Sequence, residues 1–262
     1  MSLPKPPGAS VHPAAAYGFA AGAATYVRGR PDYPPEALEW LRNTLGLRGG
    51  KVAVDLGAGT GKFTNVLLAT GARVVAVDPV AQMLDELRRN APAAEPLVGD
   101  AGHIPLAAVS VDAVVCSQSF HWFANPAALA EMHRVLRPGG VLGLIWNVRD
   151  ESVGWVAELS GLIAPYEGAA PRMASGEWRK LFPAAGFGAL YEARFPHGHT
   201  GSPEQVIVDR TLSISFIAAL PPAEREKVAT AARALIRATP SLAGKSEVTF
   251  PYFTAAYHCV RA

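Results

Sequence analysis

The sequence has few cysteines, little excess charge and no long apolar run, and each shortage excludes a class of protein. Its 262 residues include two cysteines, Cys116 and Cys259, both in apolar, strand-like stretches. This usage predicts buried free thiols rather than a disulfide framework, and a cytoplasmic location is the resulting expectation. Because no apolar run reaches the ~18 residues of a membrane span, we expect no membrane partner.

Charge is nearly balanced along the chain. Lys and Arg number 24 and Asp and Glu 22, a formal net charge of +2, and the basic residues are scattered. Nucleic-acid-binding surfaces are normally strongly basic, so we expect no nucleic-acid partner. His197 and His199 could chelate a metal, but no carboxylate or cysteine accompanies them at metal-ligand spacing, and no metal site is expected.

The stretch that organises the chain is 51–62, KVAVDLGAGTGK. Its apolar first half is typical of a strand covered on both faces, and Asp55 near the end of that strand needs a partner for its charge. The glycines that follow permit positive φ and close approach of a ligand to the backbone; they are Gly57, Gly59 and Gly61. Residues 63–70 then predict a helix whose free N–H groups face the turn.

Three nucleotide-type motifs compete for this turn. The phosphate loop G-x-x-x-x-G-K-[ST] would place Leu56 at its first glycine and Phe63 at its hydroxyl position, so the group that holds magnesium is missing. The dinucleotide fingerprint G-x-G-x-x-G would place Lys62 at its third glycine. A G-x-G-x-G turn fits throughout, and a plain glycine-rich turn without a ligand is the remaining interpretation.

Strand-like and helix-like segments alternate through the first two thirds of the chain. Beyond the central motif, strands are expected at 73–77, 95–99, 111–117 and 141–146, and helices at 35–47, 80–90 and 125–136. This alternation implies right-handed crossovers and a parallel, doubly wound α/β sheet. Later, helices are expected at 155–166, 175–185, 203–216 and 221–239, and strands at 188–195 and 248–260.

Acidic residues follow three of the expected strands, at the edge where an open parallel sheet binds its ligand; they are Asp55, Asp78 and Asp100. Asp78 comes 21 residues after Gly57, close to the ~20 at which an acidic residue reaches a ribose diol. Asp100 can accept a hydrogen bond from an adenine amino group, and Asp55 suits a cationic amino group. The missing third glycine fits a ligand without a pyrophosphate.

Four segments, in this order, resemble the class I S-adenosylmethionine-dependent methyltransferases: 55–61 (DLGAGTG), 77–79 (VDP), 99–101 (GDA) and 137–140 (RPGG). Two more, 26–34 (YVRGRPDYP) and 117–123 (SQSFHWF), are similar to the small-molecule enzymes related to trans-aconitate methyltransferase. His103 departs from the pattern at a peripheral position where many relatives carry Glu. The resemblance implies S-adenosyl-L-methionine as cofactor and a small-molecule substrate methylated on oxygen, with a carboxylate as one candidate acceptor.

The resemblance also implies the cofactor contacts. The residues for the methionine part are Asp55, Gly57 and Gly59. Those for the ribose and the adenine are Asp78, Asp100 and the amide of Ala101. Ser117 and Gln118 would lie under the sulfonium, and Tyr26 and Arg30 would close over the cofactor. The whole expected set is Tyr26, Arg30, Asp55, Gly57, Ala58, Gly59, Thr60, Asp78, Pro79, Met83, Asp100, Ala101, Ser117, Gln118 and Trp122.

His121, just after the fourth expected strand, is the candidate catalytic residue. It would act as a base or orient the substrate, because histidine titrates near neutral pH. A packing or cofactor-contacting role is the alternative. Two other functions also compete with methyl transfer: a nicotinamide-dependent oxidoreductase, and a non-catalytic module that keeps the fold and the cofactor site.

The implied fold is a Rossmann-like sheet of seven strands, mostly parallel, with an antiparallel last strand at 248–260. We expect a disordered N-terminus at 1–14 and a single methyltransferase domain at 15–262. Within that domain the expected parts are an N-terminal cover at 15–47, a cofactor-binding core at 48–147, and helical insertions over the substrate side at about 148–185 and 200–246.

Overall fold

The computed structural model describes residues 31–168 and 171–262. Tyr26, Arg30 and the N-terminal segment 1–14 lie outside the described residues, so their expected roles stay predictions. The described chain forms two compact units. We call one the core unit (33–146, 171–195 and 254–262) and the other the helical unit (147–168 and 196–253, with the described residues up to Asp32).

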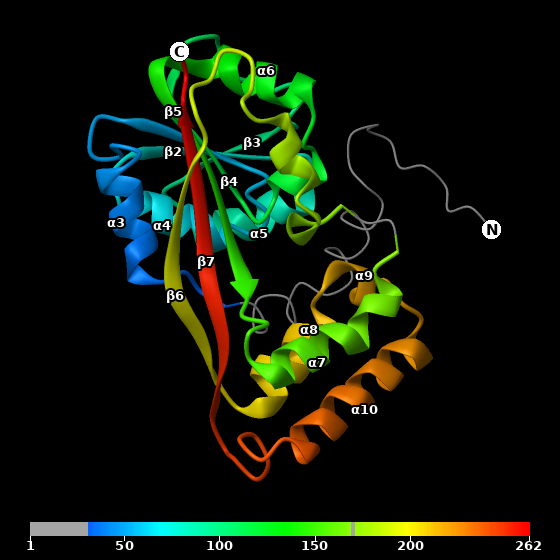
Figure 1. Ribbon diagram of the computed structural model, residues 1–262. Helices are drawn as coiled ribbons and strands as arrows, with labels where there is room; N and C mark the ends of the chain where they lie inside the picture. The colour runs from blue at the N-terminus through cyan, green and yellow to red at the C-terminus, as the bar shows by residue number, and fades with distance from the viewer. Residues whose placement is uncertain (1–30, 169–170) are drawn as a thin grey trace, which may run out of the picture. The chain divides into compact units, whose positions relative to one another are not determined.

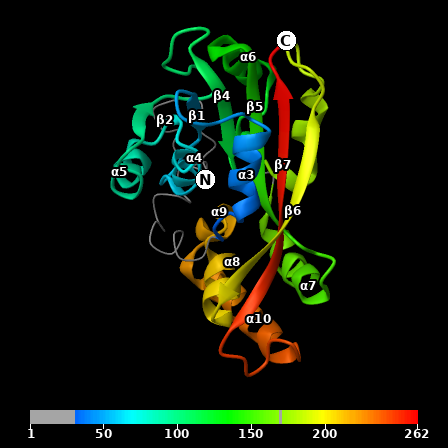
Figure 2. The same cartoon turned by 90° about the vertical axis from the view of Figure 1, so that its left-hand side faces the viewer.

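Seven strands form one sheet in the order β3-β2-β1-β4-β5-β7-β6. Their bounds are β1 Val52–Leu56, β2 Arg73–Asp78, β3 Glu95–Val98, β4 Val111–Ser117, β5 Leu136–Arg149, β6 Tyr191–Gly201 and β7 Val248–Val260. Figure 2 shows β4, β5, β7 and β6 side by side in this order. By these bounds β5, β6 and β7 contain residues of both units.

Strand direction agrees with the expected fold. The pairs β1–β2, β1–β4, β2–β3 and β4–β5 are all parallel. β7 runs antiparallel to β5, because Gly139 and Gly140 exchange backbone hydrogen bonds with Arg261 while Asp150 bonds to Pro251. Figure 1 shows the two strands pointing in opposite directions. The predicted seven-stranded, mostly parallel sheet with an antiparallel last strand is therefore confirmed.

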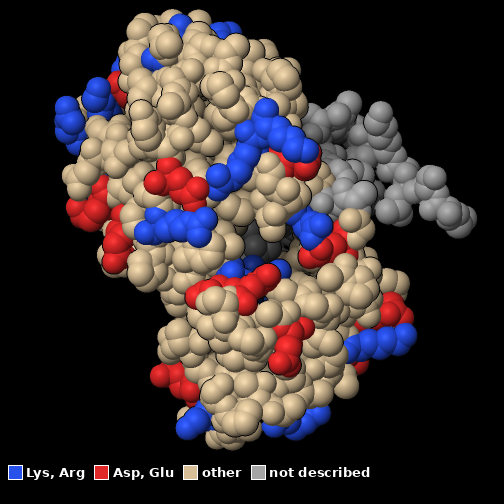
Figure 3. All heavy atoms as spheres, in the orientation of Figure 1, with Lys and Arg blue, Asp and Glu red and all other residues tan. Residues whose placement is uncertain are grey.

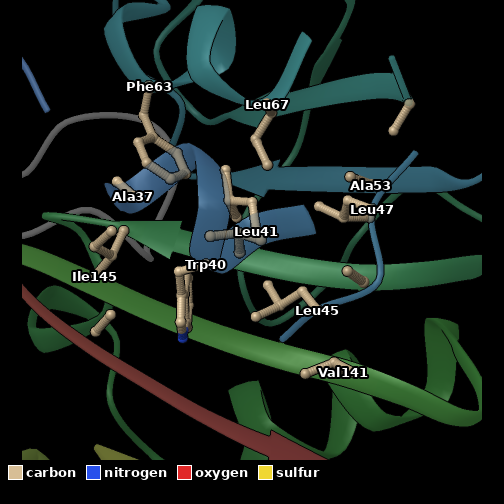
Figure 4. Packing of buried hydrophobic residues seen from close by; sticks show 14 of the residues in the cluster. Ala37, Trp40, Leu41, Leu45, Leu47, Ala53, Phe63, Leu67, Val141 and Ile145 are labelled. Carbon is tan, nitrogen blue, oxygen red and sulfur yellow. The ribbon is translucent and has the colours of Figure 1, made fainter. Parts of the chain in front are cut away.

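The core unit is held together by apolar strands covered by amphipathic helices. The middle residues of β1, β2 and β4 are Val and Ala and are almost all buried, as strands covered on both faces require. Figure 4 shows Trp40 and Leu41 of α3 packed with Ala53, Val141 and Ile145. Tyr33 packs at the edge of the same cluster, its ring centroid 4.7 Å from that of Phe63.

The helical elements of the core unit are α3 Pro35–Asn43, α4 Lys62–Leu68, α5 Ala81–Asn90, η1 Phe120–Trp122, α6 Pro126–Val135, η3 Met173–Ser175 and η4 Glu177–Leu181. The start of α6 matches the sequence prediction: the Asn125 side chain accepts a hydrogen bond from Ala128 N–H, and Pro126 takes the first position. The helix expected at 175–185 is wrong. Only 3-10 turns form there, because Gly176 adopts φ +70° and Pro183 cannot continue a helix.

The helical unit contains α7 Gly154–Ile163, η2 Ala164–Tyr166, the π-helix η5 Glu204–Asp209, α8 Arg210–Leu212, α9 Ser215–Ala218 and α10 Pro222–Ala238. Its buried cluster joins Leu159, Ile207 and Leu235 to Phe250 and Tyr252. None of the helices in the described chain combines the length and apolar character that a membrane crossing requires. On the face in Figure 3, basic and acidic groups are interspersed, and neither sign forms a large patch.

Candidate functional site

The site lies in the core unit, where β1, β2 and β4 reach their carboxyl ends. The register aligns Asp55 of β1 with Ala76 on one side and Val115 on the other, so Asp55 lies in the middle of the sheet. The turn after β1 is tied to β2 by Gly57 N–H, which donates to the carbonyl of Val77 at 2.8 Å. The residues after these strands are therefore brought to one edge, as the sequence predicted.

Asp55 is a fully buried carboxylate with one satisfied oxygen. Thr64 Oγ1 donates to Asp55 Oδ2 at 2.6 Å, whereas Oδ1 has no hydrogen-bond partner among the described residues. Burial raises the pKa of Asp55 from 3.8 to about 7; the Thr64 hydrogen bond acts against this rise, and the charge of Asp78 adds to it. A buried carboxylate in this condition favours a cation that donates a hydrogen bond to Oδ1.

The glycine turn combines a tight position with an open one. A Cβ on Gly57, which has φ +77°, would stand 2.6 Å from Ser119 Cβ, so the fold requires glycine here. At Gly59, with φ +55°, a Cβ would have no heavy atom of the described residues within 4 Å. The backbone at Gly59 is therefore open to close approach by a ligand. Ala58 and Thr60 on either side of it are buried.

Asp78, the last residue of β2, holds the turn in place. Its Oδ2 accepts from Gly59 N–H and its Oδ1 from Val80 N–H, both at 2.9 Å. Burial raises the pKa of Asp78, and the two N–H donors act against this rise. Each carboxylate oxygen can accept a second hydrogen bond, so Asp78 can hold the turn and also bind a pair of hydroxyl donors.

Asp100 lies beyond β3 and is more accessible than the other two carboxylates. Its Oδ1 accepts from the backbone N–H groups of Gly102 and His103, at 2.8 and 3.0 Å. These bonds close a small turn that fixes the carboxylate, and Ala101 is buried within it. Asp100 and Ala101 thus occupy one ordered turn.

The end of β4 supplies the next part of the site. Gln118 adopts φ +55°, a region that non-glycine residues rarely occupy, while its N–H donates to Ile145 O at 2.9 Å. Strained backbone of this kind is enriched at functional sites. Ser117 shares a hydrogen bond with the Tyr33 hydroxyl, and Ser119 Oγ donates to the carbonyl of Leu56 at 2.7 Å.

His121 lies in η1, directly after β4, and is half-buried. The indole N–H of Trp146 donates to Nδ1 of His121 at 3.2 Å. The neighbouring Trp122 is half-buried, and its ring centroid lies 5.0 Å from that of His121. Of the other expected contacts, Pro79 is exposed after β2, and Met83 is buried on α5.

Three residues that support the site were not recognised in the sequence: Thr64, Ser119 and Trp146. Thr64 had a usable signal, because the third position of the helix after the turn faces back toward the preceding strand. Ser119 fills the space in front of Gly57, and Trp146 fixes His121 from the neighbouring strand. No local sequence pattern predicts these contacts, since Ser119 is 62 residues from Gly57 and Trp146 is 25 residues from His121.

Comparison with known proteins identifies the family. Residues 54–144 match the family model described as "Methyltransferase domain". A methyltransferase-like protein of Schizosaccharomyces pombe is 38% identical over 242 residues, covering 91% of this chain and 93% of that protein. An uncharacterised methyltransferase of Mycobacterium tuberculosis is 42% identical over 246 residues, covering 94% of each chain.

Solved structures agree with this fold. A candidate type II methyltransferase from Anaeromyxobacter dehalogenans has a TM-score of 0.65 at 23% identity, covering 88% of this chain and 96% of that chain. The YcgJ protein from Bacillus subtilis has a TM-score of 0.57 at 18% identity, covering 86% and 98%. The expected methyltransferase is confirmed over the oxidoreductase alternative: the chain belongs to the methyltransferase family and has the class I methyltransferase fold.

Proposed function

We propose that the protein transfers a methyl group from S-adenosyl-L-methionine to an oxygen atom of a small molecule. The observation that carries the cofactor assignment is the buried Asp55, whose Oδ1 has no partner among the described residues. An α-ammonium group supplies the cation and the N–H donor that this oxygen requires. The residues at this edge therefore fit the methionine part of the cofactor.

The other two carboxylates support an adenosine. Asp78 is held by two backbone N–H groups, so its remaining acceptor positions suit the two ribose hydroxyls. Asp100 is fixed in its turn by Gly102 and His103, and it suits the adenine amino group. Between them, the open backbone at Gly59 lets the ligand pass close to the turn.

Bound S-adenosylmethionine supplies an activated methyl group, so the protein's main tasks are alignment and exclusion of water. Gln118 and Ser117, at the strained end of β4, would hold the backbone beneath the reacting centre. His121 would orient the acceptor. Because its Nδ1 accepts from Trp146, its proton is on Nε2, and this nitrogen acts as a hydrogen-bond donor.

Relatives with a named reaction favour oxygen as the acceptor. The malonyl-[acyl-carrier protein] O-methyltransferase of Yersinia pestis is 43% identical over 94 residues, which cover 36% of this chain and 35% of that protein. The match is confined to part of each chain, so it supports transfer to oxygen rather than that substrate. A carboxylate oxygen is the acceptor we propose.

Calorimetric titration with S-adenosylhomocysteine tests the cofactor, with NAD and NADP as controls. We expect micromolar binding of S-adenosylhomocysteine alone. Binding of a nicotinamide cofactor, or of none of the three, would contradict the proposal. A variant of the buried carboxylate tests the same assignment. Asp55→Asn removes the charge with little change of shape, and it should abolish binding of S-adenosylhomocysteine.

A screen of organic acids, alcohols and amines with methyl-labelled S-adenosylmethionine tests the acceptor. Methyl esters release labelled methanol in mild base, whereas methyl ethers and methylated amines do not. We expect base-labile product from an acid. Label that stays in the product after base treatment would exclude a carboxylate acceptor and leave the cofactor assignment standing.

A further inference from the structure

Two arginines of the helical unit converge on one tyrosine. Asp150 N–H donates to Pro251 O at 3.1 Å, which places Arg149, the last residue of β5, opposite Tyr252 on the antiparallel β7. Tyr252 is only 3% exposed. From another element of the same unit, Arg210 Nε donates to the Tyr252 hydroxyl at 3.1 Å.

Arg210 is unusually buried for a cation. It is 9% exposed and begins α8 directly after the π-helix η5. π-helices are rare and occur often at functional sites, because the wider turn displaces the side chains that follow. Arg210 thus lies at the junction of η5 and α8, and its side chain reaches the Tyr252 hydroxyl.

Each of the two guanidinium groups has one nitrogen without an acceptor in the part of the chain that the structure describes. Nη1 of Arg149 and Nη1 of Arg210 are both buried and have no hydrogen-bond partner among the described residues. Burial and the nearby charge of Arg210 lower the pKa of Arg149. Burying two cations together is costly, and an anion that accepts from both would offset this cost.

Among the described residues, no carboxylate forms an ion pair with Arg149 or Arg210. Glu151 favours the charged form of Arg149, but its Oε1 accepts from Ser160 Oγ at 2.6 Å. Arg233 of the same unit shows the ordinary arrangement, since it is paired with Glu204 at 2.6 Å and with Glu226 at 3.3 Å. The contrast sets Arg149 and Arg210 apart from the surface arginines.

We propose that Arg149, Arg210 and Tyr252 form an oxyanion-binding site that takes the carboxylate of a small organic acid. Arg210 Nη1 and Arg149 Nη1 donate to the oxyanion. The Tyr252 oxygen already accepts from Arg210, which leaves its O–H as a third donor. Planar guanidinium groups match a carboxylate in this way, and phosphate shares the same chemistry. This site is independent of the proposed methyl transfer, since all three of its residues belong to the helical unit.

The unmodified protein provides the first test. Succinate, inorganic phosphate and the neutral succinamide are titrated calorimetrically at low ionic strength. We expect succinate to bind, phosphate to bind more weakly, and succinamide to give no heat of binding. Equal binding of succinamide, or no binding by either anion, would overturn the oxyanion site. Tighter binding of phosphate than of succinate would overturn the assignment to an organic acid.

Substitutions then locate the site. Arg210→Gln and Arg149→Gln should each lower the succinate affinity about tenfold or more, because a charge-assisted donor is lost. Arg149→Lys keeps the charge and should show a smaller loss, and it remains informative if a Gln variant does not fold. Arg233→Gln, which removes an arginine already paired with glutamates, should leave the affinity unchanged. If Arg233→Gln lost succinate affinity and the Arg149 and Arg210 variants did not, the site would not lie at Arg149 and Arg210.

S-adenosylhomocysteine is titrated into the same variants. Its affinity should not change, because Asp55, Asp78 and Asp100, which carry the cofactor assignment, all belong to the core unit. This readout separates the two proposals: a protein that binds S-adenosylhomocysteine but no anion loses only the oxyanion site.

Discussion

Trp146 donates its indole N–H to Nδ1 of His121 at 3.2 Å, and this contact defines the chemistry of the histidine. Trp146 is buried against the rings of Trp178 and Tyr257, with centroids at 4.9 and 5.9 Å, so the donor is held firmly in place. With Nδ1 accepting, the neutral ring carries its proton on Nε2. The ring is therefore arranged as a donor, and the orienting role expected for His121 is favoured over that of a base.

Substitution of His121 separates these two roles. His121→Gln places an amide N–H near the position of Nε2 and cannot act as a base, so we expect it to keep turnover within about tenfold of wild type. His121→Ala should lower turnover about 100-fold, within the range measured for positioned catalytic groups. Both should leave S-adenosylhomocysteine affinity unchanged in calorimetry. Equal loss of turnover in the Gln and Ala variants would indicate a base instead.

Without ligand, Asp55→Asn should be more stable than wild type, and this difference should grow as the pH rises. The folded-state pKa of about 7 lies above 3.8, so the folded state binds the proton more tightly; the stability this provides is full below pH 3.8 and is lost as the pH rises to about 7. Asn carries no charge to bury. The variant's advantage should grow across this window to at most about 4 kcal/mol, at 1.36 kcal/mol per unit of pKa difference.

Urea unfolding of wild type and Asp55→Asn between pH 4 and pH 8 measures this difference. The curves should meet at the acid end and separate toward neutral pH. A difference that is constant with pH would mean that the Asp55 charge is not the cause. The same variant should lose S-adenosylhomocysteine binding, which would make Asp55 a residue kept at a cost in stability.

Asp78→Asn should weaken cofactor binding about 10-fold to 100-fold, since hydrogen bonds to a charged acceptor contribute about 1.5–3 kcal/mol. The structure shows that Asp78 also accepts from Gly59 and Val80, so a moderate loss of stability is expected too. Asp85→Asn, at an exposed residue of α5, is the matched control for calorimetry and thermal unfolding. Unchanged affinity in Asp78→Asn would remove the ribose assignment.

Gly59→Ala should affect binding far more than folding. Its Cβ would meet no described heavy atom within 4 Å, so the stability cost is the left-handed conformation alone, about 1–2 kcal/mol. The same methyl group would occupy space that the proposed cofactor needs, and affinity should fall about tenfold or more. Gly57→Ala is the contrasting variant: its Cβ would clash with Ser119, so thermal stability should fall strongly. Retained cofactor affinity in Gly59→Ala would show that the ligand does not approach this turn.

The parts predicted well are those that local sequence specifies. The strands at 111–117 and 248–260 form with the expected bounds, because alternating or continuous apolar residues and flanking turn residues act over a few positions. The capping of α6 by Asn125 has the same origin. The helix expected at 175–185 does not form, because Gly176 and Pro183 interrupt its apolar pattern.

The glycine turn, the three carboxylates at strand ends and the family follow from residue types at short spacing, so sequence is enough to identify them. Which of those groups find hydrogen-bond partners depends on long-range packing. Within the described residues, tertiary packing leaves Asp55 Oδ1 without a partner, gives His121 its donor from Trp146, and brings Arg149 and Arg210 to one tyrosine. These outcomes depend on contacts between residues far apart in the chain, and burial there sets the energy of each charge.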